Sequence, residues 1–368
     1  MRKPEQQWET RAWRAIREGE PSQAWAEDAR AESFVLRSAA RAEQGRVTLG
    51  LHRQQADAVA AADPDLPHAA RCWLAARGAR AVDLRDDTGR MLAQGSFELL
   101  DLSTLPATPP RRIITLAPSI AEMVHALGCF DRVVACEDSS DHPPQVREVE
   151  RLGPDLGPDL DRVAAIAPDL VLSSLTVPGM ERIVTGLHAR GVPQLVLAPR
   201  SYADVLAEIE LLGRVLAVPE RAGEVARDME RQRAELEVGR VEPAVRVYLE
   251  WWPRPMFTPG RDCYSNELVA LAGGANVFAG REGSSVRIEP AELVEAAPEI
   301  CFVSWCGVAE AKLDPANLIG RPGLEQLHAA RAGHVYPLDE AFAGRPGPRM
   351  LEASRRMAAA IGRVRLRG

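Results

Sequence analysis

Residues 219 to 238 read PERAGEVARDMERQRAELEV, a charged run with almost no turn signals, which we interpret as one long polar helix. Two stretches of sequence flank this helix, one on each side, and they share the same order of strand-like and helical patterns. The first begins at residue 112 as RIITLAPS, and the second begins at residue 245 as VRVYLEWW. Each continues with strand-like runs separated by helical patterns, which is typical of an α/β lobe. Two lobes on one rigid helix indicate a clamp around a ligand.

The predicted fold class is therefore α/β, with two parallel-sheet lobes joined by one long backbone helix and an additional N-terminal α+β domain. The sequence LPATPP at residues 105–110 is a stiff linker and the clearest boundary. The predicted units are an N-terminal domain of unknown role at 1–105, a first lobe at 111–218, an interlobe helix at 219–240 and a second lobe at 241–365.

The elements expected within these units follow from apolar periodicity and turn signals. Residues 46–52 predict a strand and 80–99 a β-hairpin, after helical patterns in the first residues of the chain. In the lobes, strands are expected at 113–116, 133–136, 170–172, 194–197, 245–250, 300–303 and 333–337, and helices at 120–127, 160–167, 180–190, 202–216, 266–272, 291–297, 324–328 and 350–361. Strands that alternate with helices predict parallel sheets.

The composition is that of an ordinary globular protein. Hydrophobic residues make up 46% and charged residues 26% of the 368 residues. The net charge of -7 gives a nucleic-acid partner no electrostatic support. No segment approaches the roughly 18 consecutive apolar residues of a membrane span, so we expect no membrane insertion.

The cellular location is also an expectation from the sequence. The first residues, MRKPEQQWETRAW, lack the apolar run of a secretory signal. The six cysteines are scattered through apolar runs, which favours reduced thiols. We therefore expect a cytoplasmic protein, or a periplasmic one if a signal has been removed.

The predicted ligand-binding residues follow the carboxyl ends of the strands, where parallel α/β sheets bind ligands. Trp251 and Trp252 would offer flat faces to a large planar ligand, and Arg254 would meet a carboxylate or phosphate. Packing in the core or over a sheet edge is the alternative for the tryptophans, and also for Trp305. Ser119 could present helix N-terminal amides to an anion or simply cap the helix. The complete predicted set is Ser119, Trp251, Trp252, Arg254, Arg261, Tyr264, Trp305, Phe342 and Arg345.

Metal chemistry and catalysis have weaker signals. His142, in an acidic loop after a strand, could be an axial ligand to the metal of a bound chelate, or it could belong to a solvated loop. Cys301 and Cys306 lack metal-ligand spacing and are predicted to be buried strand residues. No G-x-S-x-G, P-loop or HExxH motif occurs, so no catalytic residue is predicted.

Residues 111 to 362 resemble the helical-backbone periplasmic binding proteins, the substrate-binding components of ABC importers for cobalamin, haem and ferric siderophores. The resemblance is closest to the cobalamin-binding members. It rests on IITLAPS at 113–119 with Glu122, DHPP at 141–144, the helix-to-strand segment ending APDLV at 167–171, NEL at 266–268 with LAGGANVF at 271–278, and Pro348-Arg349. The resemblance implies two lobes, one backbone helix and a ligand in the cleft between them.

The resemblance also implies a permease partner, which the family meets with one exposed glutamate per lobe. Glu181 is at the first of these positions. In the second lobe the matching position is Ala291, beside Glu292, so Glu292 is the docking candidate there.

The expected function is non-catalytic binding of a corrinoid or a similar metal chelate between the lobes, with no intrinsic cofactor. Two alternatives stay open. One is an intracellular cofactor-handling enzyme or factor on the same fold, which would alter the ligand chemically. The other is the haem- or ferric-siderophore-binding component of an ABC importer.

Overall fold

The computed structural model describes residues 108–177, 179–240 and 242–365, and the backbone of three strands before them. Those strands are β1 (Arg46–Leu51), β2 (Ala81–Asp86) and β3 (Phe97–Glu98). β1 is parallel to β2, and β3 is antiparallel to β2, in agreement with the strand and the antiparallel pair expected there. The other elements expected before residue 108 lie outside the described residues.

The first lobe is built on a five-stranded parallel sheet in the order β6-β5-β4-β7-β8. Consecutive residues of its central strand face opposite sides, as the pleat requires. Ile113 packs with the helices α5 and α8, whereas Ile114 packs with α6 and α7. Helices therefore cover both faces, which explains why the central strands are apolar throughout. The bounds are β4 (Ile113–Thr115), β5 (Val133–Cys136), β6 (Glu150–Arg151), β7 (Leu170–Ser174), β8 (Gln194–Leu197), α5 (Pro118–Ala126), α6 (Leu160–Ala165), α7 (Glu181–Ala189), α8 (Tyr202–Val215) and the 3₁₀ turns Phe130–Arg132 and Pro144–Arg147.

The second lobe contains a four-stranded parallel sheet, β12-β9-β14-β15, and a small antiparallel sheet, β10-β11-β13. The antiparallel sheet was not foreseen, because its strands are only two to four residues long and two of them contain proline. The bounds are β9 (Val245–Glu250), β10 (Trp252–Pro253), β11 (Met256–Pro259), β12 (Gly274–Asn276), β13 (Ser285–Ile288), β14 (Ile300–Val303), β15 (Val335–Pro337), α10 (Ser265–Leu271), α11 (Pro290–Ala296), α12 (Ala316–Ile319), α13 (His328–Arg331), α14 (Glu340–Ala343), α15 (Leu351–Arg365) and the 3₁₀ turn Glu310–Lys312.

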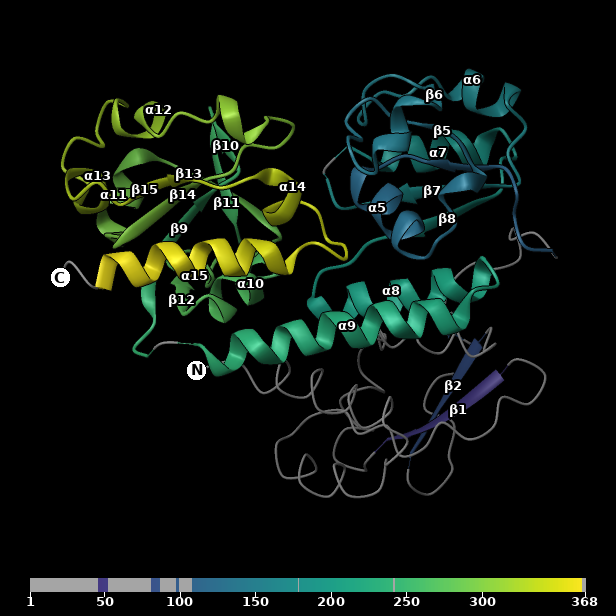
Figure 1. Ribbon diagram of the computed structural model, residues 1–368, viewed down its shortest axis with the longest axis horizontal. Coiled ribbons are helices and arrows are strands. Elements are labelled where there is room, and N and C mark those ends of the chain that lie inside the picture. The colour runs from purple at the N-terminus through teal and green to yellow at the C-terminus, as the bar shows by residue number, and fades with distance from the viewer. Residues whose placement is uncertain are drawn as a thin grey trace.

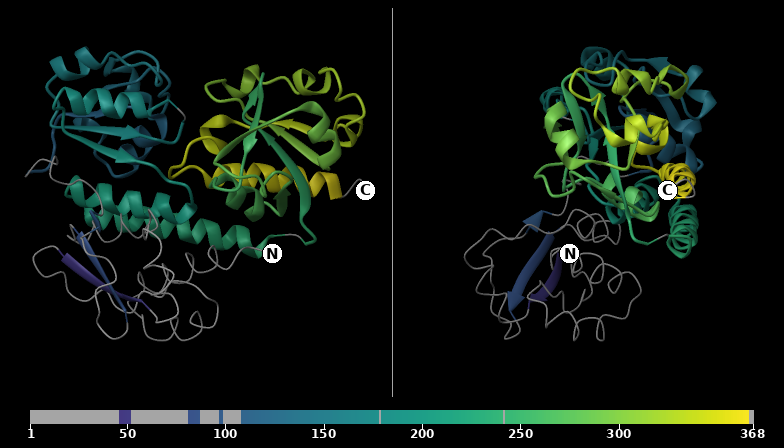
Figure 2. Two further views of the ribbon diagram at one scale, coloured as in Figure 1. Left: turned by 180° about the vertical axis from the view of Figure 1, so that it is seen from behind. Right: turned by 90° about the vertical axis from the view of Figure 1, so that its left-hand side faces the viewer.

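The backbone helix α9 (Pro219–Val238) runs beneath both lobes, beside α8 (Figures 1 and 2). Its buried residues are Ala222, Val225, Ala226 and Met229, a spacing that forms one apolar stripe on an otherwise polar helix. One continuous cluster of buried residues includes this stripe and parts of both lobes. The lobes therefore share a hydrophobic core through α8, α9 and α15, and they are not separate domains joined only by a linker.

Three expectations about local structure are wrong. No helix spans residues 324–328, since α13 begins at His328. Ser119 is not a cap, because α5 begins at Pro118 and Ala117 occupies the N-cap position. Cys301 is buried in β14 as expected, but Cys306 lies beyond that strand and is exposed.

Candidate functional site

The strand order of each lobe creates a switch point, where neighbouring strands send their connections to opposite sides of the sheet. In the first lobe these strands are β4 and β7, and in the second they are β9 and β14. Ligands of open α/β sheets bind in the crevice outside the carboxyl ends of such strands. The residues that end or follow these four strands are therefore the first place to look for a site.

Three buried polar atoms without partners lie at these switch points. Thr115 ends β4, Trp251 follows β9 and Ser304 follows β14. The hydroxyls of Thr115 and Ser304 and the indole N–H of Trp251 have no hydrogen-bond partner among the described residues. An unsatisfied buried polar group costs about 1–3 kcal/mol, and such groups are rare in folded proteins. A ligand could supply the missing partners only if a rearrangement of the covering residues exposed these atoms.

Exposed apolar side chains occur at the same ends of the sheets. Leu156 follows β6 and is 42% exposed, Leu175 follows β7 and is 39% exposed, and Trp252 follows β9 and is 43% exposed. Leu156 and Leu175 belong to the first lobe and Trp252 to the second, so each lobe presents apolar surface at its strand ends. This arrangement suits a large ligand held from two sides.

The strand ends of the two lobes are close enough to interact electrostatically. Burial raises the pKa of the Cys306 thiol to about 12, and the charges of Glu340 and of Asp155 add to this effect. Asp155 belongs to the loop that contains Leu156. Cys306, exposed as a residue but with a desolvated thiol, therefore lies within electrostatic reach of the first lobe's Asp155 loop.

Arg345 ties the lobes together at the base of this region. Its Nη1 atom donates to Glu122 at 3.3 Å and to Asp141 at 2.6 Å, and its Nη2 atom donates to Asp141 at 3.3 Å and to Glu340 at 3.2 Å. Arg349 donates to Glu122 as well. We call these five residues the interlobe ion cluster. Glu122 and Asp141 belong to the first lobe, whereas the others lie on α14 and on the loop between α14 and α15, which reaches α5 in Figure 1.

Trp305 takes part in a buried polar cluster of the second lobe. Its indole nitrogen donates to Glu250 at 2.8 Å, and Arg321 holds the same carboxylate with two hydrogen bonds. The hydroxyl of Tyr248 donates to Glu250 at 3.0 Å. The indole N–H of Trp305 therefore already donates to Glu250 and is not available to a ligand, although the ring of Trp305 is partly exposed.

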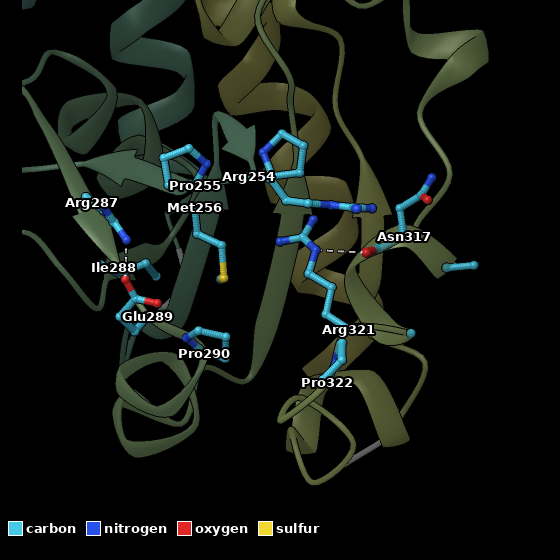
Figure 3. A pocket seen from close by; sticks show the side chains of 13 residues that line it. Arg254, Pro255, Met256, Arg287, Ile288, Glu289, Pro290, Asn317, Arg321 and Pro322 are labelled. Atoms are coloured by element: carbon cyan, nitrogen blue, oxygen red, sulfur yellow. Dashed lines mark hydrogen bonds and ion pairs between the residues drawn. The ribbon is translucent and has the colours of Figure 1, made fainter.

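Arg254 lies at a pocket of about 440 Å³ formed by the second lobe alone (Figure 3). The pocket lies between the turn after β10, the start of α11 and α12. The backbone carbonyl of Arg254 accepts a hydrogen bond from the indole N–H of Trp252 at 3.1 Å. This bond fixes the exposed tryptophan relative to the backbone of the arginine. Met256, Pro290 and Pro322 provide apolar lining.

The remaining predicted ligand residues have structural partners. Arg261 pairs with Asp262 and Glu282 on the surface. Tyr264 is buried, and its hydroxyl donates to the carbonyl of Ala343 at 3.4 Å. Phe342 makes cation–π contacts with two guanidinium groups, those of Arg349 and Arg356, at 5.2 and 4.5 Å from its ring centroid. Ser119 is buried on α5 with its backbone close to Gly347, which belongs to the loop between α14 and α15.

His142 lies beside a second histidine. Its ring centroid is 5.3 Å from that of His125, in an edge-to-face arrangement. Burial and the charge of Arg349 lower the pKa of His142, which favours the neutral, metal-ligating form. Within the described part of the chain, no group of three or more His, Cys, Asp or Glu side chains is arranged to hold a metal ion. His142 is therefore not part of a ready-made set of protein metal ligands among the described residues.

The two docking candidates differ in availability. Glu181 is exposed at the start of α7, where its carboxylate accepts from the backbone of Gly179 at 2.8 Å. Glu292 pairs with Arg281 and accepts from the backbone of Glu289 at 2.8 Å. These contacts lower the pKa of Glu292. Glu292 is therefore occupied in capping α11, while Glu181 is open to solvent.

The ion cluster contains residues that sequence reasoning did not select as ligand contacts, namely Glu122, Asp141, Glu340 and Arg349. A signal was present, because the sequence analysis had already selected His142, next to Asp141, and Arg345, near Glu340 and Arg349, as candidate site residues. The pairing between them spans more than two hundred positions and could not be read from spacing.

Across the described residues, no helix is both long and apolar enough to cross a membrane.

Comparison with known proteins agrees with this geometry. Residues 113–342 match the family model described as periplasmic binding protein. The vitamin B12-binding protein of Yersinia pestis (strain Pestoides F) is 26% identical over 261 residues, which cover 70% of this chain and 89% of that protein.

Two solved structures show the same fold. One is the periplasmic vitamin B12-binding protein of Vibrio cholerae, with a TM-score of 0.60, 24% identity and coverage of 70% of this chain and 98% of that one. The other is a periplasmic haem-binding protein from Roseiflexus sp. RS-1, with a TM-score of 0.62, 23% identity and coverage of 69% and 98%. With the family model matching well over half of its length, this chain belongs to the periplasmic binding protein family.

Proposed function

We propose that this protein binds a corrinoid, or a metal chelate of similar size, between its two lobes and releases it chemically unchanged. The observation that carries the proposal is the composition of the strand ends at the two switch points. They combine buried donors without partners and exposed apolar side chains from both lobes. The relatives that bind vitamin B12 and haem support the same ligand class.

The residues that we propose for contact are those at the strand ends. Trp251 and Trp252 would contribute aromatic surface and the indole N–H of Trp251, and Ser304 would contribute a hydroxyl. Leu156 and Leu175 would cover the opposite face of the ligand from the first lobe. Trp305 and Phe342 would extend the apolar wall through their rings. His142 is the proposed axial ligand if the metal is coordinated by the protein.

Titration calorimetry with cyanocobalamin, haem and a ferric siderophore tests the proposal. At least one of them should bind with a dissociation constant of micromolar or tighter, about -8 kcal/mol. The absorption spectrum and mass of the recovered ligand should be unchanged, whereas the enzyme alternative requires an altered ligand. Absence of both heat and thermal stabilisation with all three ligands would rule the proposal out.

We infer that a permease partner would meet the first lobe at Glu181, since Glu292 is engaged in capping. Glu181→Ala should then leave chelate affinity unchanged and reduce only transport by a reconstituted importer.

The cytoplasmic location expected from the sequence finds no support in the comparisons, which are with periplasmic proteins. Fractionation of the native host, with sequencing of the mature N-terminus, distinguishes the two locations.

A further inference from the structure

The pocket beside Arg254 is built by the second lobe alone. Every residue that lines it lies between positions 253 and 322, so the pocket does not depend on how the two lobes are arranged. Its volume of about 440 Å³ is in the range of small-molecule sites. The pocket is therefore large enough to hold a small organic molecule without any contribution from the first lobe.

Three arginines line this pocket, and two of them are neutralised by carboxylates. Arg287 pairs with Glu289 at 2.8 Å. Arg321 holds the fully buried Glu250 through both terminal nitrogens, at 2.5 and 2.6 Å. Within the described part of the chain, no carboxylate pairs with the exposed Arg254. The pocket therefore keeps one positive charge that the protein does not compensate.

Arg321 has further donors that its structural contacts do not use. A guanidinium carries five N–H groups. The Nε of Arg321 donates to the backbone carbonyl of Asn317 at 2.9 Å, and each terminal nitrogen donates once to Glu250. One N–H on each terminal nitrogen is thus without an acceptor among the described residues. Because Arg321 is only 9% exposed and lines the pocket, an acceptor inside the pocket would stabilise these donors.

Polar and apolar groups occupy different sides of the pocket. Figure 3 shows Arg254 extending from the turn after β10 toward Asn317 and Arg321, whereas Met256 and Pro290 form the other side. A molecule with a charged end and an apolar body matches this division.

We propose that this pocket is a second binding site, separate from the interlobe cleft, for a small organic anion. The carboxylate or phosphate of the anion accepts from Arg254 and from the unused donors of Arg321, and its apolar body lies against Met256 and Pro290. Arginine suits this role because its planar fork can give two parallel hydrogen bonds to either group. Occupation of this site does not require a chelate between the lobes.

Calorimetry with three probes of similar shape tests the site on the intact protein. Phenylacetate and phenyl phosphate are anionic, whereas phenylacetamide is uncharged. At least one anion should bind with a dissociation constant of roughly 1 mM or tighter, and the amide at least about tenfold more weakly. The two anions distinguish a carboxylate ligand from a phosphate ligand. High ionic strength should weaken binding of the anions, because the charge of Arg254 is exposed to screening.

Two variants assign this binding to the pocket. Arg254→Gln removes the uncompensated charge and should weaken binding of the anions by roughly tenfold without changing that of the amide. Ala316→Trp introduces a large side chain at the exposed start of α12 and should abolish binding of every probe by filling the pocket. Arg227→Gln is the matched control, because Arg227 is an exposed arginine of α9 outside the pocket.

Each outcome decides one part of the inference. If the amide binds as tightly as the anions, or if Arg254→Gln binds the anions like wild type, recognition of an anion is refuted. If neither anion binds, or if Ala316→Trp binds them normally, the site is refuted, while chelate binding between the lobes stands. Ala316→Trp should keep the chelate affinity of wild type, and its loss would show that the pocket is part of the cleft. Thermal unfolding checks both variants, which we expect to fold because both positions are exposed.

Discussion

At the level of single residues, neighbouring tryptophans after β9 have different environments. Trp251 packs partly against the core with its indole nitrogen buried, whereas Trp252 is 43% exposed with its nitrogen bonded to Arg254. Adjacent side chains in an extended segment point to opposite sides, so one sequence motif produces two roles. Trp252 is consequently the cleaner probe of ligand contact, since its removal leaves the core intact.

Trp252→Ala should weaken chelate binding without changing the free energy of unfolding. Loss of aromatic stacking is worth about 0.5–1.5 kcal/mol beyond area burial, which corresponds to roughly two- to tenfold in affinity. Calorimetry with cyanocobalamin measures it. Val238→Ala is the control, because Val238 is 90% exposed at the end of α9. Equal affinity of the Trp252 variant and wild type would show that this side chain does not touch the ligand.

Arg321→Met should destabilise the protein severely. The substitution leaves the fully buried carboxylate of Glu250 with only Tyr248 and Trp305 as partners. Breaking one half of a buried ion pair costs about 3–5 kcal/mol. Replacing both residues, as Glu250→Leu with Arg321→Met, should recover much of the loss because no buried charge is then left. Urea unfolding of the three proteins measures both effects, and a single variant within about 1 kcal/mol of wild type would contradict the argument.

At the level of elements, the contact between α8 and α9 depends on a close approach of the two helices. Gly213 of α8 has no side chain, and a Cβ atom built there would lie 2.2 Å from the Cβ of Ala222 on α9. The turn at Ala217, which has φ 59°, returns the chain directly from α8 into α9. The pair forms the rigid base on which both lobes stand in Figure 2.

Gly213→Ala should therefore push α8 and α9 apart and cost about 1–3 kcal/mol through overpacking. Gly362→Ala on α15 is the matched substitution, since nothing lies within 4 Å of a Cβ there. It should stabilise the protein by about 0.5–1 kcal/mol, because alanine favours a helix interior over glycine. Chemical unfolding compares the two. Effects of the same sign would show that helix propensity, and not the close approach, governs position 213.

At the level of the whole molecule, several long-range contacts hold the lobes in one arrangement. Tyr202 at the start of α8 donates its backbone N–H to Glu267 of α10 at 2.9 Å, and Arg355 of α15 donates to Gln232 of α9 at 2.9 Å. The interlobe ion cluster adds the direct link between α5 and the loop before α15. Such contacts favour limited hinge motion over free rotation of the lobes.

The ion pair between Asp141 and Arg345 should stabilise the protein only above acidic pH. Partial burial alone would raise the pKa of Asp141, but the hydrogen bond and charge of Arg345 outweigh it and hold the pKa below the ordinary value of 3.8. A carboxyl group whose pKa is lower in the folded state than in the unfolded state stabilises the fold fully at pH values above its unfolded-state pKa. This stabilisation is lost as the pH falls through its folded-state pKa. Because Asp141 is 63% exposed, the contribution is small, about 0.5–1 kcal/mol after screening.

Urea unfolding of wild type and Asp141→Asn at pH 7 and pH 3 measures this contribution. The variant should be less stable at pH 7, and the difference should shrink at pH 3. Asp161→Asn, at a surface pair with Arg190, is the control and should show little difference at either pH. A stability gap at Asp141 that is the same at both pH values would show that the charge of the carboxylate is not its origin.

The sequence by itself determined the two α/β lobes, the long helix between them and most strand positions. Strands such as Val133–Cys136, Gln194–Leu197, Val245–Glu250 and Ile300–Val303 were predicted with the bounds observed. These features depend on local periodicity and on burial from both faces, which a single stretch of chain records. The short antiparallel sheet and α12 and α14 escaped because each is too short to show a period.

Only the tertiary structure decided which side chains are available for a ligand. Trp305, Tyr264 and Arg345 have the residue types of a binding site, yet their polar atoms are taken by Glu250, Ala343 and the interlobe carboxylates. Thr115 and Ser304 look unremarkable in sequence but carry unpaired hydroxyls at the switch points. The physical reason is that a hydrogen bond or ion pair between distant residues depends on how the elements pack, and spacing along the chain does not record that packing.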